Sequence, residues 1–360
     1  MQQDLKYMLA FHKIFKTSLN KYFMKIQEKF GSFRAAWQNY TDLDFLPKEK
    51  FTLFLEERKT IEPQHLVEAY YRQGISAISR LSENFPAALL QISDVPCILY
   101  YCGQLSLLKR KGVAIVGSRR PTTYGLTQAR LMAGELCKEG LVIISGLARG
   151  IDTAAHQGTL EKKGATIAVL GSGLDCPYPP ENNRLLEEIS RAGLLLSEYP
   201  PGTEPLSYHF PARNRIISGL SLGVLVIEAR ARSGSLITCD FALEQGKDVF
   251  ALPGPVTSPN SIGPLRLIQQ GAKLVLHAQD VLAELGYEYQ NIFYHQQQEK
   301  AKKIKEADKI VYNLVAWEPV DLKFILKNYQ QKREGVLRSL HQLEEKGLIK
   351  QLPGEYYVRI

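Results

Sequence analysis

The feature that most constrains the fold is a series of short apolar runs between residues 112 and 277, each followed by a stretch with helical character. Strands that are covered by helices on both faces are apolar throughout and do not alternate. Repeated strand–helix units of this kind predict an α/β fold with a doubly wound, mainly parallel sheet. The predicted strands are VAIVG (113–117), LVIIS (141–145), TIAVLG (166–171), LLLSEY (194–199), GVLVIEA (223–229), DVFALPG (248–254) and KLVLH (273–277).

The flanking segments have different patterns. Residues 1–80 carry short pieces of helical spacing and predict a small helical domain. Residues 81–110 are apolar and interrupted by prolines, which is typical of a connector packed on the next domain. Residues 286–303 are rich in glutamine and lysine and predict a solvated linker. Residues 304–360 predict two short helices, a longer helix and two strand-like pieces, which is the order of a winged helix.

Composition limits the function classes. Lysine and arginine outnumber aspartate and glutamate by 45 to 37, which permits an anionic partner, but residues 111–285 hold 17 basic and 16 acidic side chains. A basic site there must therefore come from local clustering. The five cysteines form no CxxC pair, so we expect free thiols and no zinc site. No stretch approaches the roughly 20 apolar residues of a membrane span, and we expect a cytoplasmic protein without a membrane partner.

The ends of the predicted strands carry the chemistry. Ligands of an open parallel sheet bind outside the carboxyl ends of the strands. There the sequence has GSRRPTTYG (117–125), SGLARGID (145–152), GSGLDCPYP (171–179) and EARARSGSLIT (228–238). Glycine and serine allow backbone N–H groups to approach an anion, and a following helix adds its positive N-terminus. We therefore expect several anion-binding turns along one edge of the sheet.

Arginines gather in the same loops although the domain as a whole is nearly neutral. Guanidinium groups suit phosphate oxygens and also stack on bases. Such clustering favours an extended polyanion over one small phosphate, and Tyr208 and Phe210 offer aromatic faces for unpaired bases. The arginines concerned are Arg119, Arg120, Arg149, Arg213, Arg215, Arg230 and Arg232.

Catalytic patterns are weak by comparison. Asp152 and His156 lie four residues apart on one helical face, and we interpret them as a structural pair that braces the loop, with catalysis the lesser alternative. Glu228 could read a ribose hydroxyl or pair with Arg215. The chain has no Gly-Lys-Ser/Thr phosphate loop and no GxSxG nucleophile elbow.

Several blocks together resemble the DNA-processing protein A (Smf) family over residues 111–285. The most specific are HFPARNRIISGLS and RSGSLIT, supported by VAIVGSRRPTTYG and SGLARGIDTAAH. The resemblance implies an extended Rossmann-like domain between a SAM-like N-terminal domain and a C-terminal winged helix. It also implies a site that binds single-stranded DNA, formed here by Gly117, Ser118, Arg119, Ser145, Gly146, Arg149, Phe210, Arg213, Asn214 and Arg215.

The function that the resemblance implies is non-enzymatic and needs no cofactor. Members of the family bind single-stranded DNA, form homodimers, and help to load the RecA recombinase in natural transformation. Two positions that are basic in some members are Ser207 and Pro180 here, which would reduce the number of phosphate contacts.

Two alternatives remain open. A phosphoribohydrolase of the Rossmann type has similar strand-end glycines, but its PGGxGTxxE motif has no clear counterpart in EARARSGSLITCDFALEQG. An interaction module is the other, because the winged-helix basic residues Lys332, Arg333, Arg338 and Lys346 are mixed with acidic ones and could meet DNA or protein.

Overall fold

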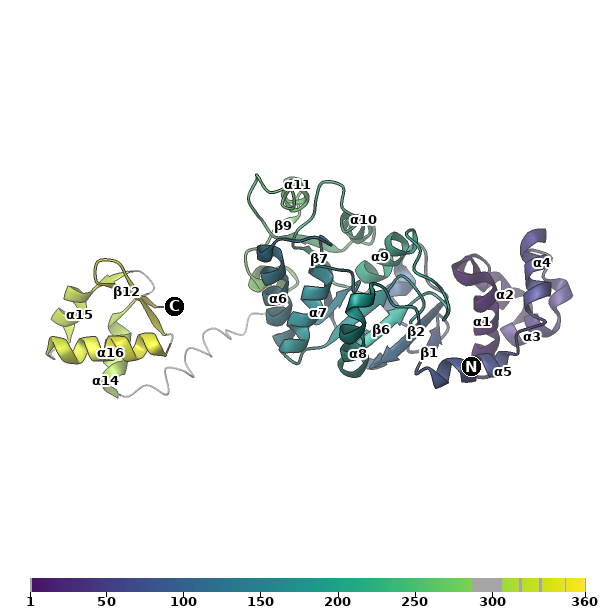
Figure 1. Cartoon of the computed structure of the whole chain (residues 1–360), viewed down its shortest axis with the longest axis horizontal. Coiled ribbons are helices and arrows are strands. Elements are labelled where there is room, and N and C mark those ends of the chain that lie inside the picture. The colour runs from purple at the N-terminus through teal and green to yellow at the C-terminus, as the bar shows by residue number, and fades with distance from the viewer. Residues whose placement is uncertain (1, 287–305, 317–318, 330–331, 347, 360) are drawn as a thin grey trace. The chain divides into compact units, whose positions relative to one another are not determined.

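The protein, seen here as a computed structural model, consists of two compact units, residues 1–287 and 288–360 (Figure 1). The structure describes residues 2–286, 306–316, 319–329, 332–346 and 348–359. The predicted linker, 286–303, lies outside the described residues except for Gly286. We describe each unit by itself.

The first unit is built on a large mixed sheet, which among the described residues has the strand order β1-β2-β6-β5-β4-β3-β7-β8-β9. The neighbours from β6 to β9 run parallel, and β2 pairs antiparallel with both β1 and β6. All seven strands predicted from the apolar runs are confirmed. They are β3 (Gly112–Val116), β4 (Val142–Ser145), β5 (Thr166–Leu170), β6 (Leu194–Ser197), β7 (Gly223–Val226), β8 (Asp248–Ala251) and β9 (Lys273–Leu274).

Helices cover both faces of the sheet, which confirms the doubly wound fold. Val113 and Ile115 of β3 face one core together with side chains of α6, α7 and α12, whereas Ala114 and Val116 face another with α9 and α10. This alternation explains why the central strands β3 to β7 are buried along their whole length. The helices are α6 (Thr123–Lys138), α7 (Ile151–Glu161), α8 (Asn183–Ala192), α9 (His209–Gly219), α10 (Leu236–Glu244), α11 (Ile262–Gln269) and α12 (Ala278–Glu284).

The N-terminal helices do not form a core of their own. Phe11, Phe33 and Phe54 are completely buried, and their cluster continues into Ile98 and Leu195 of the sheet. The aromatic side chains are large apolar surfaces that only a neighbouring layer can cover. The helices are α1 (Gln2–Phe15), α2 (Phe23–Phe30), α3 (Phe33–Gln38), α4 (Lys48–Glu57) and α5 (Pro63–Arg72), with 3-10 turns at Lys16–Lys21 and Tyr40–Asp42.

The expected connector, 81–110, belongs to the sheet. It contains β2 (Ile98–Gly103), and β1 (Ser76–Ser79) precedes it, so the sheet extends two strands beyond the predicted start at 111. The short turns η3 (Ala87–Gln91) and η4 (Leu105–Lys109) complete the segment. The sequence did not predict β2, because prolines in a segment argue against a strand. Pro96, however, precedes the first residue of β2 and does not interrupt the strand.

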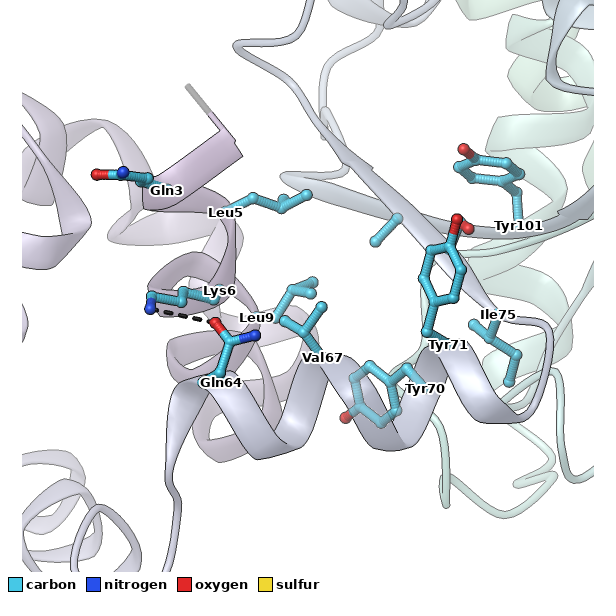
Figure 2. A pocket seen from close by; sticks show the side chains of 12 residues that line it. Gln3, Leu5, Lys6, Leu9, Gln64, Val67, Tyr70, Tyr71, Ile75 and Tyr101 are labelled. Atoms are coloured by element: carbon cyan, nitrogen blue, oxygen red, sulfur yellow. Dashed lines mark hydrogen bonds between the residues drawn. The ribbon is translucent and has the colours of Figure 1, made fainter.

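A groove of about 460 Å³ lies where α1 and α5 meet the edge strand β1. Figure 2 shows Leu5 and Leu9 of α1 beside Val67 of α5, with Tyr71 at the end toward Tyr101. Its lining is largely apolar. The hydrogen bond drawn in Figure 2 runs from Lys6 Nζ to Gln64 Oε1 at 3.3 Å. This groove is remote in sequence from the strand-end loops.

The second unit has the element order that the sequence predicts. Helices α14 (Glu306–Leu314), α15 (Leu322–Asn328) and α16 (Arg333–Glu345) pack around Val336, Leu340 and Leu343. A small sheet of order β10-β12-β11 joins Val320–Asp321, Tyr356–Arg359 and Ile349–Leu352. Asp321 caps α15 by accepting a 3.0 Å hydrogen bond from Lys323 N.

Further observations concern the cysteines, metal binding and membrane-spanning helices. All five cysteines are free. Within the described ranges, no group of three or more His, Cys, Asp or Glu side chains is placed to hold a metal ion, and no helix is long and apolar enough to cross a bilayer.

Candidate functional site

The strand order places a crevice between β3 and β7. The chain proceeds from β3 outward to β6 and then returns to β7 on the other side of β3, so the connections diverge at this point. Ligands of open α/β sheets bind at such a switch point. A cavity of about 690 Å³ opens there, and its lining includes Gly117, Ser118, Arg119, Arg120, Asp152, Tyr178, Ser207, Phe210, Arg213, Asn214, Arg230, Ser233, Gly234 and Ser235.

The turn after β3 directs two arginines to the cavity. Ser118 N donates to the Glu228 carbonyl at 2.6 Å, and Ser118 Oγ accepts from Arg120 N at 3.1 Å. A Cβ on Gly117 would stand 2.7 Å from the side chain of Ile151, so only glycine permits this tight turn. Arg119 and Arg120 are exposed. The structure thus brings Gly117, Ser118 and Arg119 together as predicted.

The loop after β4 has a mostly structural role. Ser145 is completely buried and donates its hydroxyl to the Ile115 carbonyl at 2.6 Å, so the predicted contact of Ser145 with DNA is not supported. Gly146 N donates to Asp152 Oδ2 at 3.2 Å. A Cβ on Gly146 would collide with the Arg213 guanidinium. Gly146 therefore matters because it gives Arg213 room.

Asp152 and His156 do not form the predicted pair. Asp152 braces the loop through Gly146, whereas His156 Nδ1 lies 2.7 Å from Thr166 Oγ1 on the opposite side. Burial raises the pKa of Asp152 to about 6, against the lowering influence of Arg213. Burial lowers the pKa of His156 to about 3, helped by Arg213, so this imidazole is neutral at physiological pH. Asp152 braces the loop as predicted, without His156, whose contact is with Thr166 at the start of β5.

Arg149 lies at a shallower depression that adjoins the cavity and shares Arg119, Tyr178 and Phe210 with it. Its guanidinium forms a 2.7 Å ion pair with Glu181 and a 3.3 Å hydrogen bond with the Tyr178 hydroxyl. Both partners of the ion pair are about half exposed or more, so the pair is weak and can exchange for a phosphate.

Phe210 forms the aromatic wall of the cavity. Its ring centroid lies 5.6 Å from that of Tyr178, and the Arg119 guanidinium carbon lies 5.3 Å from it. A Cβ on Gly171 would approach the Phe210 ring to 2.9 Å, so the end of β5 fixes the position of the ring from behind. A half-buried ring with a cation beside it suits an unpaired base.

Arg213 and Asn214 line the cavity as buried groups. Arg213 is 3 % exposed and donates from Nη1 to the Gly146 carbonyl at 2.9 Å and to the Val169 carbonyl, and from Nε to Asn214 Oδ1 at 3.1 Å. Burial lowers its pKa to about 10, and the nearby Asp152 opposes this shift. The guanidinium stays charged at neutral pH and is held in one place.

Arg215 is not at the cavity. It is 5 % exposed and forms a bidentate pair with Glu198, with distances of 2.7 Å to Oε2 and 2.6 Å to Oε1. It also donates to the Asp94 carbonyl at 3.0 Å. Burial acts against the charged form, but Glu198 outweighs it and raises the Arg215 pKa. The structure gives no support to the predicted contact of Arg215 with phosphate, because this guanidinium pairs with Glu198 and does not line the cavity.

Glu228 has neither of the roles considered for it. Its carboxylate accepts from Thr122 N at 2.8 Å and Thr122 Oγ1 at 2.6 Å, and it supports the start of α6. It is 3 % exposed and also accepts from Asn260 Nδ2 at 3.4 Å, whereas Arg215 pairs with Glu198. A catalytic glutamate of the phosphoribohydrolase type would need a free carboxylate at this place.

Several polar lining residues lie outside the set that we predicted for the site. Arg120 and Arg230 are exposed at the cavity, with Ser233 and Ser235 beside them at the start of α10. The loop patterns GSRRPTTYG, for Arg120, and EARARSGS, for the other three, indicated them, but the sequence did not show that these two loops face each other. Ser207 also lines the cavity, so its lack of charge bears directly on the site.

The fold and the site define a Rossmann-like α/β protein with an arginine-lined cavity at the switch point of its sheet. The comparisons then identify the family. The chain belongs to the DNA recombination-mediator protein A family, whose model matches residues 76–286. The match begins at β1, in agreement with the extended sheet.

Relatives and solved structures agree with this assignment. The DNA processing protein DprA of Streptococcus pneumoniae is 50 % identical over 65 % of this chain and 82 % of its own, and the Smf protein of Escherichia coli is 43 % identical over 89 % and 88 %. The solved S. pneumoniae DprA structure aligns with a TM-score of 0.61. A second solved structure is that of DNA processing protein A from Helicobacter pylori, which is described by its single-stranded DNA binding mode. Its sequence is 36 % identical, and the alignment covers 59 % of this chain and 95 % of that chain with a TM-score of 0.54.

Proposed function

We propose that the protein binds single-stranded DNA in the cavity between β3 and β7 and performs no chemical step on it. The observation that carries this proposal is the lining of the cavity, where four arginines surround one half-buried phenylalanine ring and a single carboxylate, that of Asp152, opposes them. Arginine forks hold phosphates and an aromatic face stacks an unpaired base. A single-stranded DNA binding mode is also described for the related H. pylori protein.

We assign the contacts within the cavity residue by residue. Arg119 would hold phosphate together with the backbone N–H groups of Gly117 and Ser118, while Phe210 would stack a base. Arg213 and Asn214 would form the floor, and Arg149 would hold a phosphate at the adjoining depression in exchange for Glu181. Gly146 supports the floor, and Ser145 and Arg215 support the scaffold.

The cellular role that fits such binding is accessory to recombination. We propose that the protein acts in the cytoplasm as a homodimer, protects incoming strands, and helps to load RecA in natural transformation. The family assignment and the DNA-processing relatives support this role. We further propose that residues 304–360 act as a winged helix, because α14, α15, α16 and the strands β11 and β12 follow one another in the order of that fold.

The test is fluorescence anisotropy of labelled oligo-dT with Arg119→Ala against the unaltered protein across a salt series. Loss of one phosphate contact and of the cation beside Phe210 should weaken binding roughly tenfold or more at low salt and flatten the salt dependence. Arg184→Ala is the matched control, because this arginine is 92 % exposed on α8 and does not line the cavity. Equal affinity of Arg119→Ala and the unaltered protein would exclude the site, and equal affinity for oligo-dT and a mononucleotide would exclude the function.

A further inference from the structure

A second basic cavity lies at the opposite edge of the same sheet. Its volume is about 400 Å³. It is lined by residues that directly precede three parallel strands and by the segment 83–88. Lys111 stands before β3, Leu222 before β7 and Lys247 before β8. Because these strands are parallel, their amino ends meet at one edge, away from the carboxyl ends that form the first cavity.

Positive charge dominates this second cavity. Lys109, Arg110, Lys111 and Lys247 line it, and Glu83 is the one carboxylate among the described residues of the lining. Arg110 Nη2 donates to the Gly140 carbonyl at 2.8 Å, which directs this guanidinium toward the end of α6. The first three basic side chains are exposed and Lys247 is half-buried. The domain as a whole is nearly neutral, so four cations against one carboxylate form a distinct local charge.

The lining offers charge without a stacking face. Phe85 contributes to it but is only 6 % exposed, and the polar groups of Asn84 and Ser221 add neutral hydrogen-bonding capacity. This chemistry suits a phosphodiester backbone, which presents one negative charge for each nucleotide and needs no base contact. A strand of five residues such as β3 spans roughly 17 Å, so one or two nucleotides in the first cavity do not reach the second.

We propose that the cavity at the amino edge is a second contact for the backbone of a single DNA strand whose other part occupies the first cavity. This inference rests on the proposed function. It adds a path: the strand passes from the aromatic cavity, where a base is stacked, to a purely electrostatic surface at the other end of β3, β7 and β8. Affinity for DNA then grows with strand length beyond what the first cavity accommodates.

The experiment compares two oligo-dT lengths in the full chain. Lys109→Gln/Lys247→Gln removes two charges from the second cavity and leaves Lys111 in place. We expect unchanged affinity for a strand of about 2 nucleotides, and a roughly tenfold loss for one of about 30 nucleotides at low salt. The slope of log affinity against log salt for the longer strand should fall by about 1.4, which is about 0.7 for each lost phosphate contact on a single strand.

The matched control is Lys25→Gln/Lys48→Gln, which makes the same change in net charge at two exposed positions of α2 and α4. It should bind both strands as the unaltered protein does. If the second-cavity variant keeps its affinity and salt slope for the longer strand, the inference is wrong and the proposed function stands. The same holds if this variant loses affinity for an acidic peptide such as oligo-glutamate but not for the longer strand. If the unaltered protein binds neither strand, both fall together.

Discussion

Two arginines that are two positions apart in α9 show how much the surroundings decide a role. Arg213 and Arg215 are both buried, and both come from a segment that suggests phosphate binding. Arg213 meets main-chain carbonyls and one amide oxygen at the floor of the cavity, whereas Arg215 meets the carboxylate of Glu198 behind it. The first keeps a net positive charge for a ligand, and the second is neutralised by the protein.

We expect Arg215→Ala to destabilise the fold strongly. The substitution leaves Glu198 buried without its counter-ion, at 2 % exposure, and breaking one side of a buried pair costs about 3–5 kcal/mol. Urea denaturation measures this change in the free energy of unfolding. Arg184→Ala, at an exposed i,i+4 pair with Glu188, should change it by less than about 0.5 kcal/mol. A loss below about 1 kcal/mol for Arg215→Ala would contradict the structural role.

Asp152 gives the cavity a pH dependence. Its folded pKa of about 6 is raised above the ordinary value of 3.8, so the folded protein holds the proton at pH values where the unfolded chain has lost it. The stability that this proton contributes is present at low pH and is lost as pH rises from about 4 to about 6. In the folded protein the Asp152 carboxylate gains its negative charge around pH 6, and that charge repels phosphate.

Oligo-dT affinity should therefore rise several-fold as pH falls from about 7 to about 5. Asp152→Asn should bind at neutral pH as the unaltered protein does near pH 5, and its own affinity should change little over this range. His156, with a pKa of about 3, does not titrate in the window. Anisotropy in buffers of constant ionic strength tests this, and a pH profile unchanged by Asp152→Asn would refute it.

At the level of elements, the position of α9 decides the shape of the cavity. Phe210 lies in its first turn and rests on Gly171 at the end of β5, while Gln245 after α10 donates to the Arg215 carbonyl at 3.1 Å. Neighbouring elements thus fix the helix at its first turn and near its middle. A change behind the ring should alter DNA binding although it touches no ligand.

Gly171→Ala tests this coupling. The added methyl would stand 2.9 Å from the ring, so Phe210 must move, and we expect a roughly three- to tenfold loss of oligo-dT affinity. Phe210→Leu alone should lose about as much. If the effect passes through the ring, the double variant Gly171→Ala/Phe210→Leu should lose no more than Phe210→Leu. Additive losses would show that Gly171 acts by another route.

The sequence was sufficient for the seven strands from β3 to β9, but not for β1 and β2 or for the contacts of the side chains at the strand ends. Apolar runs such as 113–117 predicted buried strands, because a strand that helices cover on both faces has no alternation of polar and apolar residues. The partners of Arg215 were hidden, because Glu198 lies 17 residues away and is one of several carboxylates that could have met it. Ser145 was misjudged for a related reason: whether a hydroxyl at a strand end faces a ligand or the Ile115 carbonyl depends on rotation within the sheet.

For the whole molecule, the two ends of the chain differ in how far the sheet depends on them. The N-terminal helices cover Ile98 and Leu195, whereas residues 288–360 form a unit with its own core. Loss of the N-terminal helices therefore exposes apolar sheet surface.

We expect the chain without residues 288–360 to stay folded and to bind short oligo-dT with an affinity within about threefold of the full chain, since the lining of the first cavity lies wholly within residues 116–238. The chain without residues 1–75 should instead aggregate or unfold at a lower temperature. Size-exclusion chromatography and thermal denaturation distinguish the two cases. A monodisperse, equally stable protein after the N-terminal deletion would show that the helices are dispensable.

The anchoring of Arg213 has a consequence for how a ligand is received. Its guanidinium is ordered by carbonyls of two strand ends before any ligand arrives, so binding there loses little rotamer entropy, which otherwise costs about 0.5–1.5 kcal/mol for each side chain that is immobilised. Arg119, Arg120 and Arg230 are exposed and must be ordered on contact. The ordered Arg213 guanidinium can thus set the register of a DNA strand. The three exposed arginines can adapt to the different backbone conformations of different DNA sequences.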